Sequence, residues 1–213
     1  MATSLQTPSD SATRQRVLQA AAGICARSGS SSLSIVGLTD ESGVSNGSIY
    51  HHFGSREGVI ASLVLDAFSS YQEGLLSVLN EHQEDAQGGV ESMVRYHLGW
   101  MEANPDLARL LVEQRDQVAE GPEGGRLRDQ NRLFFREVKA WLDGRASAGQ
   151  IEEVSIDLAH ALVFAPAQEL SRHWLSGRLK EEPGRHADRL AAAAWASISA
   201  NSETKARKRR QPR

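Results

Sequence analysis

The sequence predicts an all-α protein in which an N-terminal three-helix helix-turn-helix domain is followed by a larger helical domain. Apolar side chains recur at helical spacing through most of the chain, and no stretch shows the alternation of a half-buried strand. A Gly-Val-Ser turn at residues 43–45 lies between two short amphipathic segments, as in a helix-turn-helix. We therefore expect about nine helices and no sheet.

The two helices before this turn are marked by their ends. Residues 13–28 form the first helix, and Gly29 ends it. Ser34 is placed to cap the second helix, which ends at Gly43, where a positive φ costs little. The single cysteine, Cys25, falls on the inward stripe of the first helix, so we expect a small buried hydrophobe rather than a disulfide or a thiolate metal site.

The helix after the turn has the surface of a recognition helix. Ser45 is placed to cap it, and Ile49 and Phe53 fall one turn apart on a face suited to burial. The remaining faces are short, polar and free of acidic side chains, as contact with base edges and phosphates requires. An ordinary connection between two helices is the alternative for this motif taken alone.

These residues resemble the N-terminal domain of the TetR family of bacterial transcriptional regulators. The resemblance rests on Gly43-Val44-Ser45, on Ile49-Tyr50-His51-His52-Phe53 and on Ser55-Arg56-Glu57, and it covers residues 13–65. The chain departs from the family pattern in its second helix. Thr39 and Ser42 replace common alanines there, and Gly37 inside the helix costs about 1 kcal/mol in helix propensity.

The resemblance implies binding of double-stranded DNA at a near-palindromic operator. Asn46 is expected to influence base preference, whereas Arg56 is expected to contact phosphate and to contribute to binding of all sequences alike. The predicted DNA-binding residues are Ser34, Ser45, Asn46, Gly47, Ser48, Tyr50, His51, His52 and Arg56.

The rest of the chain is predicted to be helical, with loops at glycine and proline clusters. Gly88-Gly89 is expected to break the chain after a long fourth helix, and residues 120–125 are the clearest loop. The last two helices are expected over about residues 153–176 and 185–200. The predicted division is a flexible arm at 1–12, a DNA-binding domain at 13–54, an effector and dimerisation domain at 55–200, and a basic disordered tail at 201–213.

The last two predicted helices have apolar surfaces suited to self-association. The first is apolar around much of its girth, and the second is rich in alanine, which permits close helix approach. The resemblance implies a homodimer held by a four-helix interface, and the alternative is that these helices only cover their own core. The predicted interface residues are Leu162, Pro166, Leu170, Trp174, Leu190, Ala191, Ala194, Trp195 and Ile198.

The middle helices are predicted to hold a small-molecule effector. They combine aromatic side chains with a few polar groups, as ligand pockets do, although aromatic residues at helical spacing also pack in ordinary cores. The candidate ligand-binding residues are Tyr96, His97, Trp100, Phe134, Phe135, His160, Phe164 and Gln168.

The sequence does not favour an enzyme. His51 and His52 are neighbours about 100° apart on a helix, so they cannot face one metal ion. No Glu-x-x-His motif and no phosphate-binding glycine loop is found, and Gly43-Val44-Ser45-Asn46-Gly47, which has Gly-x-Ser-x-Gly spacing, lies between two predicted helices and not after a strand, as a nucleophile elbow requires. We therefore expect no catalytic residues, no metal site and no cofactor.

Charge is distributed unevenly along the chain. Six of the 24 lysines and arginines lie in residues 204–213, which leaves 18 basic against 27 acidic residues elsewhere, a net charge of about −9. An acidic body binds DNA poorly without a local surface for it, and the basic tail either adds phosphate contacts or is only solvated. No apolar run is long enough to span a membrane and no signal peptide is recognised, so a cytoplasmic location is expected.

Together these patterns predict a homodimeric, sequence-specific transcriptional regulator. A repressor released from its operator by an effector is the preferred interpretation. An activator or a regulator that requires its ligand to bind, and a helical adaptor that does not bind DNA, remain alternatives.

Overall fold

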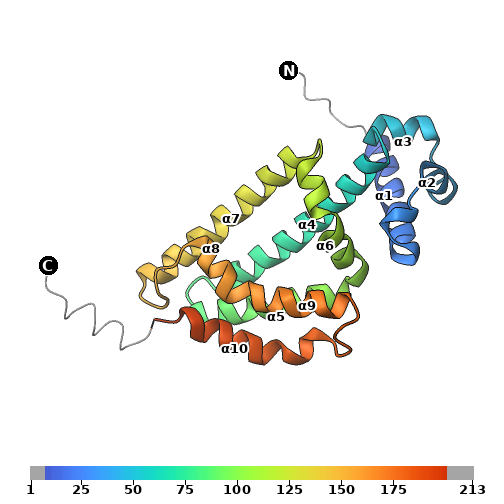
Figure 1. Ribbon diagram of the computed structural model, residues 1–213. Helices are drawn as coiled ribbons and strands as arrows, with labels where there is room; N and C mark the ends of the chain where they lie inside the picture. The colour runs from blue at the N-terminus through green and yellow to red at the C-terminus, as the bar shows by residue number, and fades with distance from the viewer. Residues whose placement is uncertain (1–7, 201–213) are drawn as a thin grey trace, which may run out of the picture. The chain divides into compact units, whose positions relative to one another are not determined.

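The computed structural model describes residues 8–200, and this range is helical apart from loops and one isolated bridge between Ile151 and Ser199 (Figure 1). The α-helices are α1 (Pro8–Ser28), α2 (Ile35–Ser42), α3 (Asn46–Phe53), α4 (Arg56–Glu81), α5 (Ala86–Ala103), α6 (Pro105–Glu120), α7 (Gly124–Ser147), α8 (Ile156–Ala159), α9 (Ala165–Leu175) and α10 (Ala187–Ile198). A π-helical segment at His160–Phe164 joins α8 to α9, and short 3-10 turns are η1 (Ser30–Ser32) and η3 (Pro183–His186). With α8 and α9 counted as one interrupted helix, the described chain has nine helices, which confirms the predicted all-α fold.

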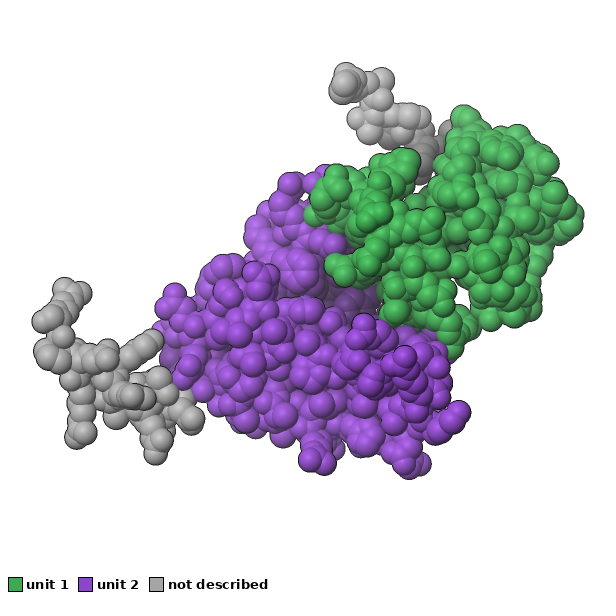
Figure 2. Space-filling model, in the orientation of Figure 1, with its two compact units in different colours: residues 1–69, 106–128 green, residues 70–105, 129–213 purple. Residues whose placement is uncertain are grey.

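The chain forms two compact units (Figure 2). Residues 1–69 and 106–128 belong to unit 1, and residues 70–105 and 129–213 belong to unit 2. Helices α4 and α7 each contribute residues to both units. The predicted boundary at residue 54 does not coincide with a boundary between the two compact units, and the division by function stays a prediction.

The first helix begins earlier than the sequence suggested. Helix α1 starts at Pro8 instead of residue 13, so residues 8–12 are helical and the predicted arm is wrong for them. Proline is well suited to a first helical position because the missing N–H has no helical partner there anyway. The rest of the predicted arm, residues 1–7, lies outside the described residues.

The helix-turn-helix is held by local capping interactions. The Ser34 hydroxyl accepts a hydrogen bond from the Gly37 N–H at 3.1 Å, and the Ser45 hydroxyl accepts one from the Ser48 N–H at 3.3 Å. Gly43 has a φ of 64° between the two helices, as expected for the end of α2. The core beneath them contains fully buried side chains from α1, α2, α3 and α4, namely Val17, Ala21, Leu38, Ile49 and Val59.

Unit 2 has its own apolar core, to which α5 contributes along most of its length. The predicted break at Gly88-Gly89 is wrong, because α5 begins at Ala86 and its cap, Asp85, accepts a hydrogen bond from the Gly88 N–H at 2.9 Å. Gly89 has a packing role. A Cβ there would lie 2.4 Å from the Trp141 ring, so glycine allows this ring to pack directly on the helix backbone.

Residues 198–200, at the end of α10, lie close to the loop that precedes α8. Glu152 donates its backbone N–H to the carbonyl of Ile198 at 2.8 Å, and Ala200 donates to that of Gln150 at 3.1 Å. The predicted helix over about 153–176 is observed as Ile156–Leu175 with the π-helical segment inside it. The predicted tail at 201–213 lies outside the described residues. Among helices of the described chain, none is long and apolar enough to cross a membrane.

Candidate nucleic-acid interface and aromatic cluster

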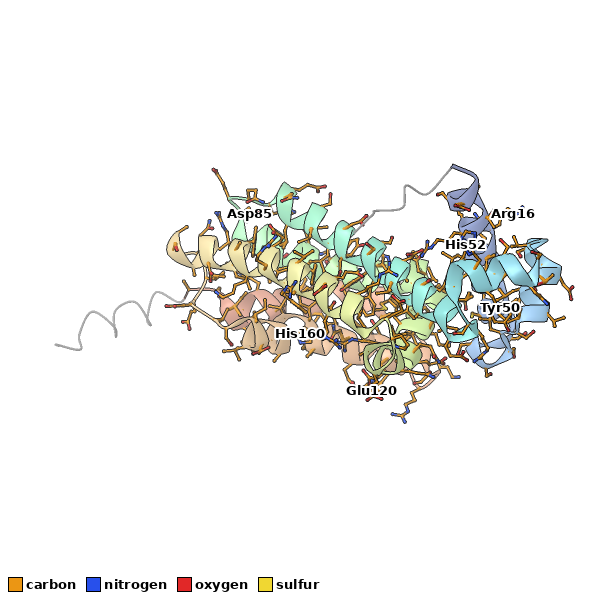
Figure 3. All side chains as sticks on the ribbon, turned by 90° about the horizontal axis from the view of Figure 1, so that it is seen from above. Arg16, Tyr50, His52, Asp85, Glu120 and His160 are labelled. Carbon is orange, nitrogen blue, oxygen red and sulfur yellow. The ribbon has the colours of Figure 1, made fainter. Side chains whose placement is uncertain are left out.

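Helix α3 presents a polar surface on a buried anchor. Ile49 is fully buried, while Asn46, Gly47 and His51 are exposed and Tyr50 retains 52% of its surface. No acidic residue occurs in this helix. Tyr50 and His52 point to different sides of α3, as residues two positions apart on a helix must (Figure 3).

Gly47 lies on this exposed surface without a structural need for glycine. A Cβ added at this position would meet no atom within 4 Å, and the residue has no positive φ. Nothing inside the protein therefore requires the missing side chain. A glycine here does leave the backbone open to close approach by another molecule.

Arg56 is turned toward the protein. Its Nε donates to the carbonyl of Leu33 at 2.6 Å and its Nη2 donates to that of Ser30 at 2.7 Å, so the guanidinium braces the turn that leads into α2. Nη1 is 3.1 Å from a carboxylate oxygen of Glu57. Sequence reasoning placed Arg56 at the interface and missed this bracing role, because the turn lies 23 or more positions away in the chain.

The structure bears on two further predictions in this region, the phosphate contact of His52 and the burial of Cys25. His52 has only 10% of its side chain exposed and lies 3.9 Å from Asp10, so it offers little surface to a phosphate. Cys25 is half-buried and not fully buried as predicted, and this partial burial raises the pKa of its thiol.

A cluster of aromatic rings surrounds Tyr71 in unit 2. The Tyr71 hydroxyl is 2.9 Å from Nδ1 of His97, and the Tyr96 hydroxyl donates to the backbone carbonyl of Tyr71 at 3.1 Å. The Trp100 ring lies 5.2 Å from the Tyr71 ring, centroid to centroid. Phe164 continues the cluster, with its ring 6.4 Å from that of His97.

Five of the eight predicted ligand-binding residues join this cluster, since His160 also stacks on Phe164 at 6.1 Å. Phe134 packs against the core and its ring contacts that of Phe135, which is partly exposed, and Gln168 is exposed. Tyr71 was missed. Its position, three residues after Phe68 and four before Leu75 on the apolar stripe of α4, was the signal that could have indicated it.

His97 is a buried neutral imidazole. Only 1% of its surface is exposed to solvent. Burial together with the nearby His160 lowers its pKa from 6.5 to about 4. Within the described chain its Nε2 has no hydrogen-bond partner. Burial also raises the pKa of Tyr71, so this phenol keeps its proton. Among the described residues, Nδ1 is the one acceptor near the Tyr71 hydroxyl, so we infer that the phenol donates to Nδ1 and that the imidazole proton lies on Nε2.

The predicted dimer residues divide into two groups. Ala191, Ala194 and Ile198 are buried in the core of unit 2, so they offer no surface to a partner and are left out of the contact surface proposed below. The others retain exposed surface along α9, the π-helical segment and α10: Leu162, Pro166, Leu170, Trp174, Leu190 and Trp195.

Nothing in the described range suggests a metal centre, since no three His, Cys, Asp or Glu side chains there come together as ligands.

Comparison with known proteins agrees with the geometry of α2 and α3. Residues 17–63 match the model of the bacterial regulatory proteins of the tetR family. No curated protein sequence matches the chain.

Solved structures share the fold over most of the chain at low identity. A TetR family regulator from Marinobacter aquaeolei has a TM-score of 0.69 at 18% identity, covering 91% of this chain and 98% of its own. The regulator PfmR from Thermus thermophilus has 0.63 at 22%, covering 85% and 97%. FadR from Bacillus subtilis, solved with stearoyl-CoA, has 0.69 at 17%, covering 86% and 98%.

Proposed function

Because residues 17–63 form the N-terminal domain of the TetR family and the described chain has the fold of TetR-family transcriptional regulators, we propose that this protein is a homodimeric repressor that a small molecule releases from its operator. DNA binding is assigned to residues 13–54, and dimerisation and effector binding to residues 55–200. Such a protein works where the bacterial chromosome lies, in the cytoplasm.

The acid-free exposed face of α3 carries the proposal. It is capped by Ser45 and anchored by Ile49, so its side chains are presented from a fixed backbone. Tyr50 has the size and exposure to contact the DNA backbone or a base edge, and Gly47 allows close approach. One short helix contacts few base pairs, so two such helices related by a two-fold axis are expected at successive major grooves.

The first experiment is selection of bound fragments from random DNA. Wild type is compared with Tyr50→Ala and with Val112→Ala, a matched control that removes an equally exposed apolar side chain of unit 1 away from α3. Wild type and Val112→Ala are expected to enrich one near-palindrome, which Tyr50→Ala loses. Equal enrichment by all three proteins would exclude α3 as the recognition helix, and no enrichment by wild type at low salt would count against DNA binding.

The partly exposed apolar side chains of α9 and α10 support self-association. Trp174 and Leu170 lie one turn apart on α9, so a charge at either position would face the partner in a dimer. The variant Trp174→Arg is expected to sediment as a monomer and to lose operator binding. Ala193→Arg, on an exposed position of α10 outside the proposed surface, serves as its control.

The Tyr71 cluster supports an effector site in unit 2. Its rings supply apolar surface, and Nε2 of the neutral His97 supplies a donor for a carbonyl or similar oxygen. A hundredfold loss of operator affinity on effector binding requires about 2.7 kcal/mol of coupling.

Effector binding can be measured by fluorescence, because Trp100 lies in the cluster. Wild type and Trp100→Phe are titrated with a panel of aromatic ketones, steroids and acyl-CoA esters, including the stearoyl-CoA found with the Bacillus subtilis relative. A true effector changes the emission of wild type more than that of the variant, and it lowers operator binding. A ligand that raises operator binding instead would identify a corepressor.

A further inference from the structure

The side chain of Asn46 is held by a hydroxyl from the neighbouring helix. Thr39 of α2 places its Oγ1 2.5 Å from Oδ1 of Asn46, the first residue of α3. The same Oγ1 lies 3.0 Å from the backbone carbonyl of Ile35. A threonine hydroxyl has only one proton, so it can donate to one of these two oxygens.

The shorter contact locates the proton. Two oxygen atoms 2.5 Å apart repel each other unless a proton lies between them, and the amide oxygen of Asn46 has none. The Thr39 hydroxyl therefore donates to Oδ1 of Asn46. The amide is thereby oriented, with its oxygen toward α2 and its NH2 group available on an exposed residue.

This orientation matters for base recognition in the major groove. An unrestrained asparagine pairs with adenine through two bonds, donating to N7 and accepting from the N6 amino group. In this protein Thr39 holds that oxygen toward α2, so the amide cannot present its oxygen and its NH2 group together to the N6 and N7 edge of adenine. Guanine, with acceptors at both N7 and O6, and thymine, with an acceptor at O4, need only the NH2 group, whereas adenine offers this group the single acceptor N7 beside its N6 donor.

We propose that Thr39 is a specificity-determining residue, which makes Asn46 a hydrogen-bond donor that selects guanine or thymine over adenine and cytosine. The inference rests on the proposed DNA-binding function, and it adds a residue outside α3 to the determinants of operator sequence.

The test is selection from random DNA by the full-length protein and its variants. Asn46→Ala identifies the base pair that Asn46 contacts, because preference is lost there alone. Wild type is expected to select guanine or thymine at this base pair. Thr39→Ser, which keeps the hydroxyl, retains that preference, whereas Thr39→Val, which replaces the hydroxyl by a methyl group of similar size, shifts it toward adenine by roughly fivefold to tenfold. Thr39→Ala gives the same comparison if the valine variant does not fold.

The outcomes separate this inference from the proposed function. A wild-type protein that enriches no DNA contradicts both. Enrichment with adenine or cytosine at the Asn46 base pair, or an unchanged preference in the valine and alanine variants, overturns the role of Thr39 and leaves the proposed function standing. A shift at every base pair would show a general disturbance of α2 and α3, and it would also overturn the specific role of Thr39.

Discussion

The α2–α3 surface, made up of Thr39 on α2 and of Asn46, Gly47, Tyr50 and His51 on α3, lies in unit 1, and the Tyr71 cluster lies in unit 2. Both hold polar groups on a rigid scaffold, but these groups face different surroundings. On the α2–α3 surface, Asn46 is fixed by a neighbouring hydroxyl while its amino group stays in solvent. In the cluster, His97 is fixed by Tyr71 while its remaining nitrogen is enclosed by protein.

The difference fits the two roles proposed above for these regions. A donor in solvent costs nothing until a partner arrives, because water satisfies it. An enclosed donor without a partner costs about 1–3 kcal/mol, which a ligand oxygen would return. The α2–α3 surface is thus suited to a large polar partner that covers it, and the cluster to a small apolar molecule with one acceptor.

The largest expected effect tests the packing of the cluster. A Cβ at Gly74 would lie 2.1 Å from the hydroxyl of Tyr96, so Gly74→Ala is expected to displace that ring and destabilise the protein by about 3 kcal/mol. Urea unfolding measures the loss. Gly99→Ala is the control, since a Cβ there meets no atom within 4 Å, and its stability should be unchanged or slightly increased. Similar curves for both variants would mean that the cluster is loosely packed.

The next effect is a pH dependence of stability that arises from His97 in the Tyr71 cluster. The pKa of His97 falls from 6.5 to about 4 on folding, so below pH 6.5 the unfolded chain binds a proton that the folded chain does not. Its contribution to stability is complete above that pH and is lost as the pH falls toward 4, by roughly 2 kcal/mol at pH 5. Unfolding free energies of wild type and His97→Gln at pH 7.5 and 5 isolate this change. An equal loss of unfolding free energy between pH 7.5 and pH 5 in the two proteins would contradict a buried neutral His97.

A smaller effect is expected at Arg56. Its hydrogen bonds to the carbonyls of Leu33 and Ser30 support the turn before α2, so Arg56→Gln should cost about 1–2 kcal/mol of stability. Operator affinity should fall with it, while the dependence of affinity on salt concentration stays close to that of wild type. If Arg56→Gln instead reduces the slope of log affinity against log salt concentration by about one, then Arg56 contacts a phosphate as the sequence predicted.

The smallest effect on stability is expected at Gly47 on the α2–α3 surface, in contrast to Gly74 in the cluster. A side chain there meets no protein atom, so Gly47→Ala should leave the unfolding free energy unchanged or raise it by less than about 1 kcal/mol. Its operator affinity should nevertheless fall if DNA approaches the α3 backbone closely. Unchanged affinity in a filter-binding or fluorescence assay would remove Gly47 from the interface.

Sequence was a good guide where the contacts are local. The caps at Ser34 and Ser45 and the positive φ at Gly43 depend on residues within a few positions, and all three were predicted correctly. Asp85 was missed as the cap of α5 because the two following glycines were taken for a break.

Sequence was a poor guide where partners are distant. Tyr71 meets His97 across 26 positions, and Arg56 reaches Ser30 across another 26, so neither partner could be named from spacing. The burial of Ala191 and Ala194 also depends on which face of α10 packs inward, which an alanine-rich helix does not specify.

The π-helical segment has a consequence for sequence comparison. Its hydrogen bonds span one residue more than those of an α-helix, so residues after Phe164 are rotated by about 100° relative to an uninterrupted helix. A relative whose helix is regular at this point can be aligned correctly only with a one-residue gap between His160 and Phe164. An ungapped alignment would exchange core positions such as Ala167 and Ser171 with surface positions through the rest of α9.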